Sequence, residues 1–204
     1  KPRSMLINMS RFVKVQSVIK EYVDEIQDNF IRTIKYNFDE DSSKNVHLSL
    51  FQELKQLWDK HFNNVTDINF ADIVKKKNLL GAVYDIERDI PKMNIIVVNG
   101  SSASKLDYKS NPSLRVIAIG GLALSRGLTL EGLLVSYFYR NTATFDVLMQ
   151  MGRWFGYRPH YDDLFQIWTS QASVTWYREI ATAASELKAD IKKMFEQHLT
   201  PKDF

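Results

Sequence analysis

Residues 115–158 read RVIAIGGLALSRGLTLEGLLVSYFYRNTATFDVLMQMGRWFGYR, and this stretch decides the fold class. Residues 116–119 form an apolar run that ends in Gly120 and Gly121, and a second apolar run covers residues 133–139. Apolar strands that alternate with helices are typical of a parallel sheet with helices on both faces. Ligands bind such sheets at the carboxyl ends of the strands. The stretch therefore predicts an α/β fold with the loop after residue 119 at the ligand-binding edge.

The rest of the chain supplies further strands and helices for this sheet. Apolar runs predict strands over residues 5–9, 94–99 and 164–169, and helical spacing predicts helices over residues 13–28, 146–156 and 176–199. We expect Ser10 to cap the first helix. Residues 30–90 are interpreted as a helical insert within a single domain that spans residues 1–204. The basic run at residues 75–77 is typical of a helix C-terminus.

Composition restricts the classes of function. The 204 residues carry a net charge of +3 with a pI near 8.9, which is too weakly basic to indicate nucleic-acid binding by itself. The absence of cysteine excludes disulfides, thiolate zinc sites and a cysteine nucleophile. The sequence shows no secretion signal and no apolar run of the roughly 18 residues that a membrane span needs, so we expect a cytoplasmic protein. Because the chain begins at Lys1 and not at Met, we expect a longer parent protein.

Glycines and arginines within residues 115–158 indicate phosphate chemistry. Gly121 and Gly127 let backbone amide groups approach a phosphate closely, although a tight turn after a strand explains glycines equally well. Two arginines, Arg153 and Arg158, follow the second apolar run. A guanidinium group is a permanently charged, forked donor that suits a phosphate.

Two motifs in this stretch resemble those of known helicases. SRGLTLEG at residues 125–132 resembles motif V of superfamily 2 helicases, and QMGRWFGYR at residues 150–158 resembles motif VI, which carries the arginine finger. The chain also resembles the Z-one domain family over nearly its whole length. The motifs that carry this resemblance are GGLALSRGLTLEGL, SYFYR and QMGRWFGYR. Its members are helicase-like C-terminal domains of bacterial proteins, including ATP-dependent restriction systems, and they are often labelled endonucleases.

The resemblance implies a RecA-like fold of the P-loop NTPase type and an ATP site shared with an N-terminal RecA-like domain of the same longer protein. That partner domain would hold the Walker A lysine and the magnesium ion, since no Walker A motif occurs in this chain. We therefore expect the chain alone to lack ATPase activity. The implied site residues are catalytic Arg153 and Arg158; nucleotide-binding Gly121, Gly127, Thr129 and Gln150; and DNA-binding Ser125, Arg126 and Arg140.

Two positions depart from the usual helicase pattern. Thr129 stands where many helicases carry Asp, which puts a ribose or arginine contact in question. Arg158 lies beyond the usual finger position, so either Arg153 or Arg158 is a candidate for the finger. An ion pair with Asp146 or Asp163 is the structural alternative for Arg153. The aromatic residues around motif VI fit core packing, with base stacking on single-stranded nucleic acid as the alternative.

Two other functions stay open. A metal-dependent endonuclease would need a ligand set such as the Glu-x-Lys triplets at residues 53–55 and 186–188, but both fall on helical patterns and the four histidines lack ligand spacing. A non-catalytic docking module would present the apolar face around Trp58 and Phe62 to a partner. Nuclease or methyltransferase subunits are the partners that a restriction-type protein implies.

Overall fold

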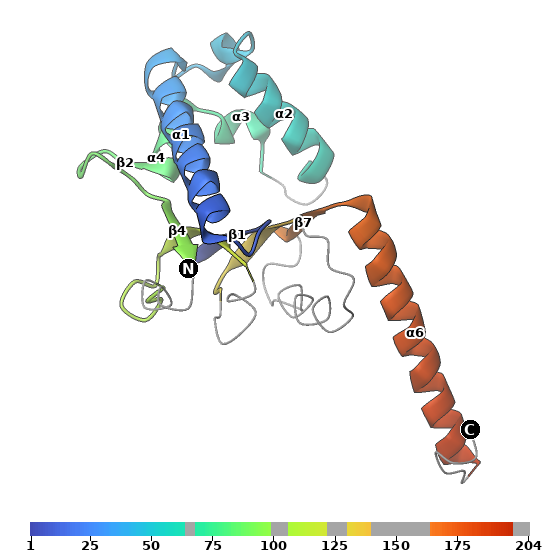
Figure 1. The fold of residues 1–204 in the computed structure, drawn as a ribbon. Coiled ribbons are helices and arrows are strands. Elements are labelled where there is room, and N and C mark those ends of the chain that lie inside the picture. The colour runs from blue at the N-terminus through green and yellow to red at the C-terminus, as the bar shows by residue number, and fades with distance from the viewer. Residues whose placement is uncertain (64–67, 99–105, 122–129, 140–163, 198–204) are drawn as a thin grey trace.

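The computed structural model describes residues 1–63, 68–98, 106–121, 130–139 and 164–197. Five parallel strands form one sheet in the order β4-β5-β1-β6-β7, with β1 in the centre (Figure 1). The strands are β1 (Arg3–Asn8), β4 (Asn94–Val98), β5 (Arg115–Gly120), β6 (Leu133–Phe138) and β7 (Gln166–Thr169). The predicted α/β class, with a parallel sheet flanked by helices, is confirmed.

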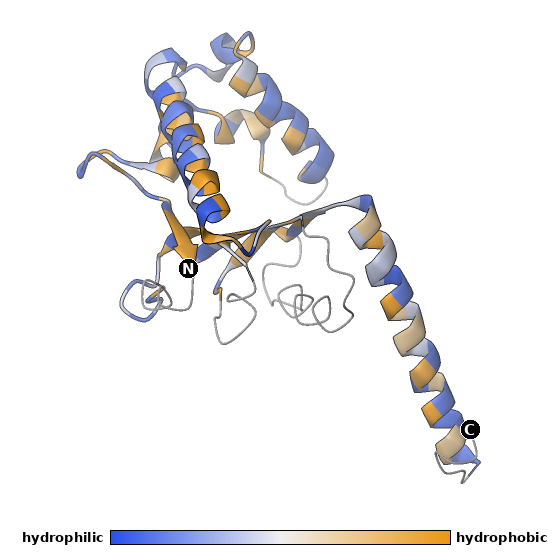
Figure 2. Ribbon diagram, in the orientation of Figure 1, coloured by the Kyte–Doolittle hydropathy of each residue, from blue (hydrophilic) through white to orange (hydrophobic). Residues whose placement is uncertain are grey.

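Apolar side chains cover both faces of this sheet, because successive residues of a strand point to opposite faces. Helix α1 (Val13–Asn37) lies across one face (Figure 2). The core under α1 contains Ile7, Ile95, Ile117 and Ile119, with Ile19 and Val23 of the helix packed on them. The core of the opposite face contains Leu6, Val98, Ala118, Leu130, Leu133 and Phe138. Each fully buried aliphatic or aromatic side chain stabilises the fold by about 1.5–3 kcal/mol.

Helix α1 also contributes to a second hydrophobic core. The other helices of this core follow α1 in the sequence and precede β4. These are η1 (Ser42–Asn45), α2 (Ser49–His61), α3 (Phe70–Ile73) and α4 (Lys76–Val83), followed by the hairpin of β2 (Tyr84–Asp85) and β3 (Ile90–Pro91). Ile34 of α1 and the adjoining Phe38 pack there with Val74 and Leu79. The sequence predicts that the first helix ends at residue 28, but it continues to Asn37 because its second half has this core to cover.

Two predicted helix ends are wrong. Phe12, not Ser10, is the residue that precedes α1, and no side chain caps this helix; the Ser10 hydroxyl instead accepts a hydrogen bond from the Phe12 amide at 3.1 Å. The basic run at residues 75–77 begins α4 and does not end a helix. The Lys75 ammonium lies 2.7 Å from the Asp72 carboxylate of α3, which offsets its unfavourable place at a helix N-terminus.

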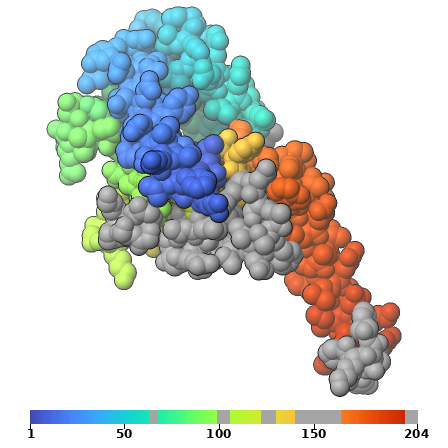
Figure 3. All heavy atoms as spheres, in the orientation of Figure 1, coloured from blue at the N-terminus to red at the C-terminus, as the bar shows by residue number. Residues whose placement is uncertain are grey.

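The last helix, α6 (Gln171–Glu196), extends away from the rest of the molecule (Figure 3). It begins before the predicted residue 176, because the Ser170 hydroxyl caps it by accepting from the Ser173 amide at 3.1 Å. Tyr177 packs on Phe138 of the sheet, and burial raises the pKa of its hydroxyl to about 12. Beyond Tyr177 the apolar side chains Leu187, Ile191 and Phe195 of this helix are exposed, up to 82% at Phe195. None of the described helices has the length and apolarity that crossing a membrane requires.

Candidate functional site at the carboxyl edge of the sheet

The carboxyl ends of the three central strands lie side by side. β1 ends at Asn8, between Gly120 at the end of β5 and Phe138 at the end of β6. The chain goes from β1 to the edge strand β4 and then runs through β5, β6 and β7 in the opposite direction, so the connection after β1 winds the opposite way from those after its neighbours β5 and β6. Open α/β sheets bind ligands at such a switch point. The loop after β5 therefore begins at the edge where the sequence predicts a ligand.

Gly121 brings the loop after β5 into contact with the loop after β1. A Cβ atom at this buried position would lie 2.9 Å from the Ser10 carbonyl oxygen and 3.1 Å from the Arg11 Cα. The same carbonyl accepts a hydrogen bond from the Gln16 side chain at 2.8 Å. A side chain at residue 121 would push these two loops apart, so the glycine is required by this approach of backbone to backbone. Its assignment to a nucleotide stays a prediction.

Several buried polar atoms at this edge have no hydrogen-bond partner among the described residues. Asn8 is 0% exposed, and neither its amide nitrogen nor its amide oxygen is paired. The Gln16 Oε1, Ser136 Oγ and Thr169 Oγ1 atoms are likewise unpaired. Each such group costs about 1–3 kcal/mol when it is buried without a partner. A concentration of them at one edge is therefore unusual for a site that only stabilises the fold.

Three of these residues share the face of the sheet opposite α1. Asn8 pairs in register with Phe138, which pairs with Thr169, and Ser136 pairs with Leu6. Paired residues in parallel strands point to the same face of the sheet. Asn8, Ser136 and Thr169 therefore lie on the face that also carries Leu6 and Phe138. Sequence reasoning missed all of them. One feature of the sequence could have indicated Asn8: the apolar run at residues 5–7 is followed directly by this amide residue.

The loop between β1 and α1 adds positive charge to this edge. Arg11 is exposed, with its guanidinium 5.1 Å from the ring centre of Phe12. The first turn of α1 has no acidic residue and no side-chain cap. The free amide groups of a helix N-terminus carry a partial positive charge and favour an anion. This edge therefore suits a negatively charged group.

The other predicted site residues lie outside the described residues. They are Gly127, Thr129, Gln150, Arg153 and Arg158, and the DNA-binding candidates Ser125, Arg126 and Arg140. Asp146 and Asp163, the alternative partners of Arg153, are outside them too. Gly121 and Tyr139, which precede these stretches, lie at the carboxyl edge, where the Tyr139 amide donates to the Asn8 carbonyl at 3.0 Å.

Comparison with protein families identifies the chain. The family model described as Z1 domain matches residues 1–204. The chain belongs to the Z1 domain family. The resemblance to the Z-one family that its motifs carry is thereby confirmed over the whole chain. Comparisons with curated proteins and with solved structures found no match.

The endonuclease alternative has no ligand set in the described part of this Z1 domain. No three His, Asp or Glu side chains come together there in a group that could hold a metal ion. In the triplet at residues 53–55, Glu53 accepts a hydrogen bond from Ser49 at 2.8 Å, whereas Lys55 pairs with Asp59 one turn later. These two charged side chains thus serve their own helix.

The docking alternative rests on aromatic residues that pack within the helical part of the Z1 domain. The Trp58 ring lies 5.9 Å from the ring of Phe70 and 5.9 Å from that of Phe62. Both Trp58 and Phe62 are partly buried. The exposed apolar side chain of α2 is Leu57, so this helix presents no large aromatic patch at the predicted position.

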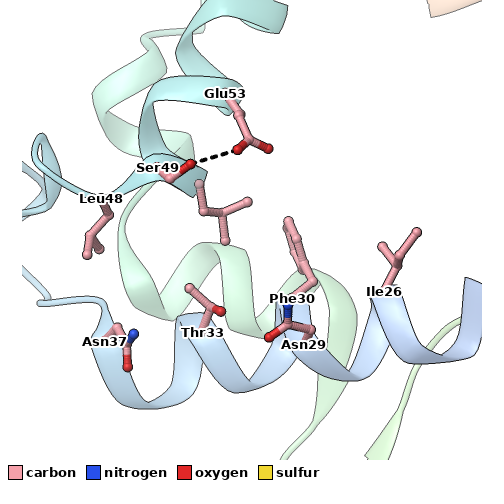
Figure 4. A pocket seen from close by; sticks show the side chains of 9 residues that line it. Ile26, Asn29, Phe30, Thr33, Asn37, Leu48, Ser49 and Glu53 are labelled. Carbon is pink, nitrogen blue, oxygen red and sulfur yellow. Dashed lines mark hydrogen bonds between the residues drawn. The ribbon is translucent and has the colours of Figure 1, made fainter.

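A hollow of about 420 Å³ lies between α1 and α2, away from the sheet (Figure 4). Its apolar lining residues include Ile26 and Phe30 of α1 and Leu48 and Leu50, and its polar lining residues include Ser49 and Glu53, which are joined by a hydrogen bond. Of the residues that the sequence singles out for chemistry, Glu53 lines it, and that carboxylate accepts the hydrogen bond from Ser49. The hollow is a gap in the packing between two helices. The carboxyl edge of the sheet is the better candidate site.

Proposed function

We propose that this Z1 domain is the helicase-like C-terminal domain of a bacterial ATP-dependent DNA-processing protein of the restriction or defence type. In this proposal a RecA-like sheet forms one wall of an ATP site, and the N-terminal RecA-like domain of a longer protein forms the other. The supporting observation is the contact of Gly121 with the Ser10 turn at the switch point of a parallel sheet. In the sequence, the segment that resembles motif V follows Gly121, and this glycine lies at the edge where such sheets bind ligands.

The chemistry of the described edge fits a polyphosphate. The uncapped N-terminus of α1 offers backbone amides, and Arg11 offers a fixed charge. The buried Asn8 amide nitrogen has no partner among the described residues and can donate a hydrogen bond to a phosphate oxygen. ATP supplies the phosphoanhydride bond, and the role proposed for Arg153 or Arg158 is to stabilise the charge on the transferred phosphate. An arginine in that position contributes about 10³–10⁵-fold in rate.

The test measures ATP turnover by the longer protein that carries this domain. Arg153→Ala or Arg158→Ala should lower kcat by about 10³-fold or more if that residue is the finger. Arg32→Ala is the matched control, because Arg32 is exposed in the second half of α1, away from the carboxyl edge. Near-normal turnover at saturating ATP by both arginine variants would contradict the proposed ATP site.

The proposed DNA contacts are tested separately. Arg126→Ala and Arg140→Ala should each weaken DNA binding for all sequences alike, because backbone contacts carry no sequence information. The slope of log affinity against log salt should fall by about one for each lost phosphate contact. Salt slopes equal to those of the Arg32→Ala control would remove both residues from the interface.

A further inference from the structure

A second polar hollow lies at the opposite, amino-terminal edge of the sheet. It has a volume of about 390 Å³ and is formed by the hairpin of β2 and β3 and by the segments that lead into β4 and β5. Its polar lining residues are Asp85, Arg88, Lys92, Asn94, Asn111, Ser113 and Arg115. We call it the amino-edge pocket. Three cationic side chains and one carboxylate line it, so its local charge is positive.

Arginines occupy paired positions in the sheet beside this pocket. Arg3 begins β1, Arg115 begins β5, and the two are partners in the parallel register. Like charges on directly paired residues destabilise a sheet. Burial, with the charge of Arg3 beside it, lowers the pKa of Arg115 below its ordinary value. The two guanidinium groups therefore repel each other at a place where the sheet gains nothing from their charge.

Among the described residues, one carboxylate pairs with one of these cations. The carboxylate of Asp85 is 4.0 Å from Arg88. No described carboxylate lies within 4.0 Å of the charged nitrogens of Arg3, Lys92 or Arg115.

Two of the cations have a partial structural explanation. Lys92 donates to the Gly81 carbonyl at 2.8 Å, and Arg115 donates to the Ala82 carbonyl, so both satisfy the C-terminal end of α4. Each bond uses one N–H group, and a guanidinium has five. Capping α4 also gives no reason for Arg3, which donates no side-chain hydrogen bond among those recorded for the described residues. The end of α4 thus accounts for two cations, and it leaves Arg3 and most N–H groups of Arg115 available to an anion.

We propose that the amino-edge pocket binds a phosphate group, held by Arg115, Lys92 and Arg88 with Arg3 beside them. The neutral groups of the lining fit this ligand. The Asn111 Oδ1 atom already accepts from the Ser113 amide at 3.3 Å, which leaves the Asn111 Nδ2 group free to donate. Asn94 is exposed at the start of β4 and supplies a second amide. Arginine and lysine with amide donors are the groups that contact phosphates in protein–nucleic acid interfaces.

The phosphate has two chemically equivalent sources, the backbone of a nucleic acid or a free phosphate. The site lies at the edge of the sheet opposite the proposed ATP site, so it goes beyond the proposed function and does not depend on it. Failure of the arginine-finger experiment would leave this pocket unaffected.

The experiment measures anion binding by the full chain and by a charge-reduced variant. Arg3→Gln combined with Arg88→Gln removes two exposed cations without touching the bonds that cap α4. Arg32→Gln combined with Lys60→Gln is the control, with the same change in net charge on exposed helix positions. The probes are inorganic phosphate, followed by calorimetry, and a fluorescein-labelled oligonucleotide, followed by anisotropy over a series of salt concentrations. Thermal melts without anion establish that both variants are folded.

Two results support the site and one overturns it. Saturable phosphate binding that is lost only in the Arg3 and Arg88 variant assigns the pocket to free phosphate. Weaker oligonucleotide binding, with a salt slope lower by about one per lost cation, assigns it to a nucleic-acid backbone. Equal binding of both probes by the variant, the control and the parent chain overturns the proposal. Arg115→Lys keeps the charge but loses the forked donor, and should weaken binding several-fold where the guanidinium contacts the anion.

Discussion

The two edges of the sheet are formed by the same three central strands but differ in their chemistry. At the carboxyl edge, β1 meets its neighbours through a glycine contact and buried, unpaired amide and hydroxyl groups. At the amino edge, β1 and β5 begin with paired arginines. Neutral polar groups without partners lower stability through desolvation, whereas like charges lower it through repulsion that salt screens. The two edges therefore respond differently to substitution and to ionic strength.

The largest effect is expected for the glycine at the amino edge. Gly132 has a φ of +64°, and a Cβ atom there would lie 2.0 Å from the Pro2 carbonyl oxygen. Gly132→Ala should lower the free energy of unfolding by about 2–5 kcal/mol, because backbone strain and the clash add. Gly121→Ala should cost less, about 1–3 kcal/mol, since its nearest atom is 2.9 Å away. Urea denaturation measures both.

Gly81→Ala is the matched control for these glycines. Gly81 lies in α4, and a Cβ atom there would meet nothing within 4 Å. The substitution should raise stability by about 0.5–1 kcal/mol. If Gly132→Ala shifts the urea midpoint in the same direction as Gly81→Ala, a Cβ atom at residue 132 is not crowded and the prediction is wrong.

A second prediction concerns the unpaired amide of the carboxyl edge. Asn8→Leu replaces a fully buried polar group by an apolar one of similar volume, and should raise the free energy of unfolding by about 1–3 kcal/mol. The same substitution should lower ATP turnover by the longer protein. Asn45→Leu is the control: its buried amide accepts from the Asp39 amide at 2.8 Å and donates to the Asp39 carbonyl at 2.9 Å. Asn45→Leu should therefore lower the free energy of unfolding. If Asn8→Leu lowers it as well, the Asn8 amide has a hydrogen-bond partner and the prediction is wrong.

The smallest effect is expected for the paired arginines. Arg3→Gln should raise stability by about 0.2–1 kcal/mol at low ionic strength, because it removes a repulsion between directly paired residues. The gain should shrink as sodium chloride is added, since salt screens exposed charges. Denaturation at two salt concentrations, with Arg32→Gln for comparison, measures it. A gain that does not depend on salt would have a cause other than charge.

The sequence predicts the strands well and the polar contacts poorly. Strands such as β4 and β5 are continuous apolar runs, and such runs are visible without any knowledge of their neighbours. The order of the strands has no local signal, because it depends on which loops cross the central strand. The length of α1 was missed for a related reason: its second half covers a core made by residues 70–83, which are distant in the sequence.

The candidate site shows the same limit. Gly121 was predicted from its place after an apolar run, and the structure explains it by contact with Ser10. The importance of Asn8 depends on its burial and on the lack of a partner, and neither can be inferred from a single amide at the end of a strand. Ser10 looked like a helix cap, but the chain makes one further turn before α1 begins.

Helix α1 begins beside Gly121 and ends in the core of Ile34 and Phe38. With 25 residues it is a rod of about 37 Å, at 1.5 Å per residue. A tilt of about 5° at its first turn would displace its far end by about 3 Å, given that length. The helices packed on that end would travel with it. A rigid tilt of α1 would therefore move the helices packed on its far end further than the loop after β1 at its near end.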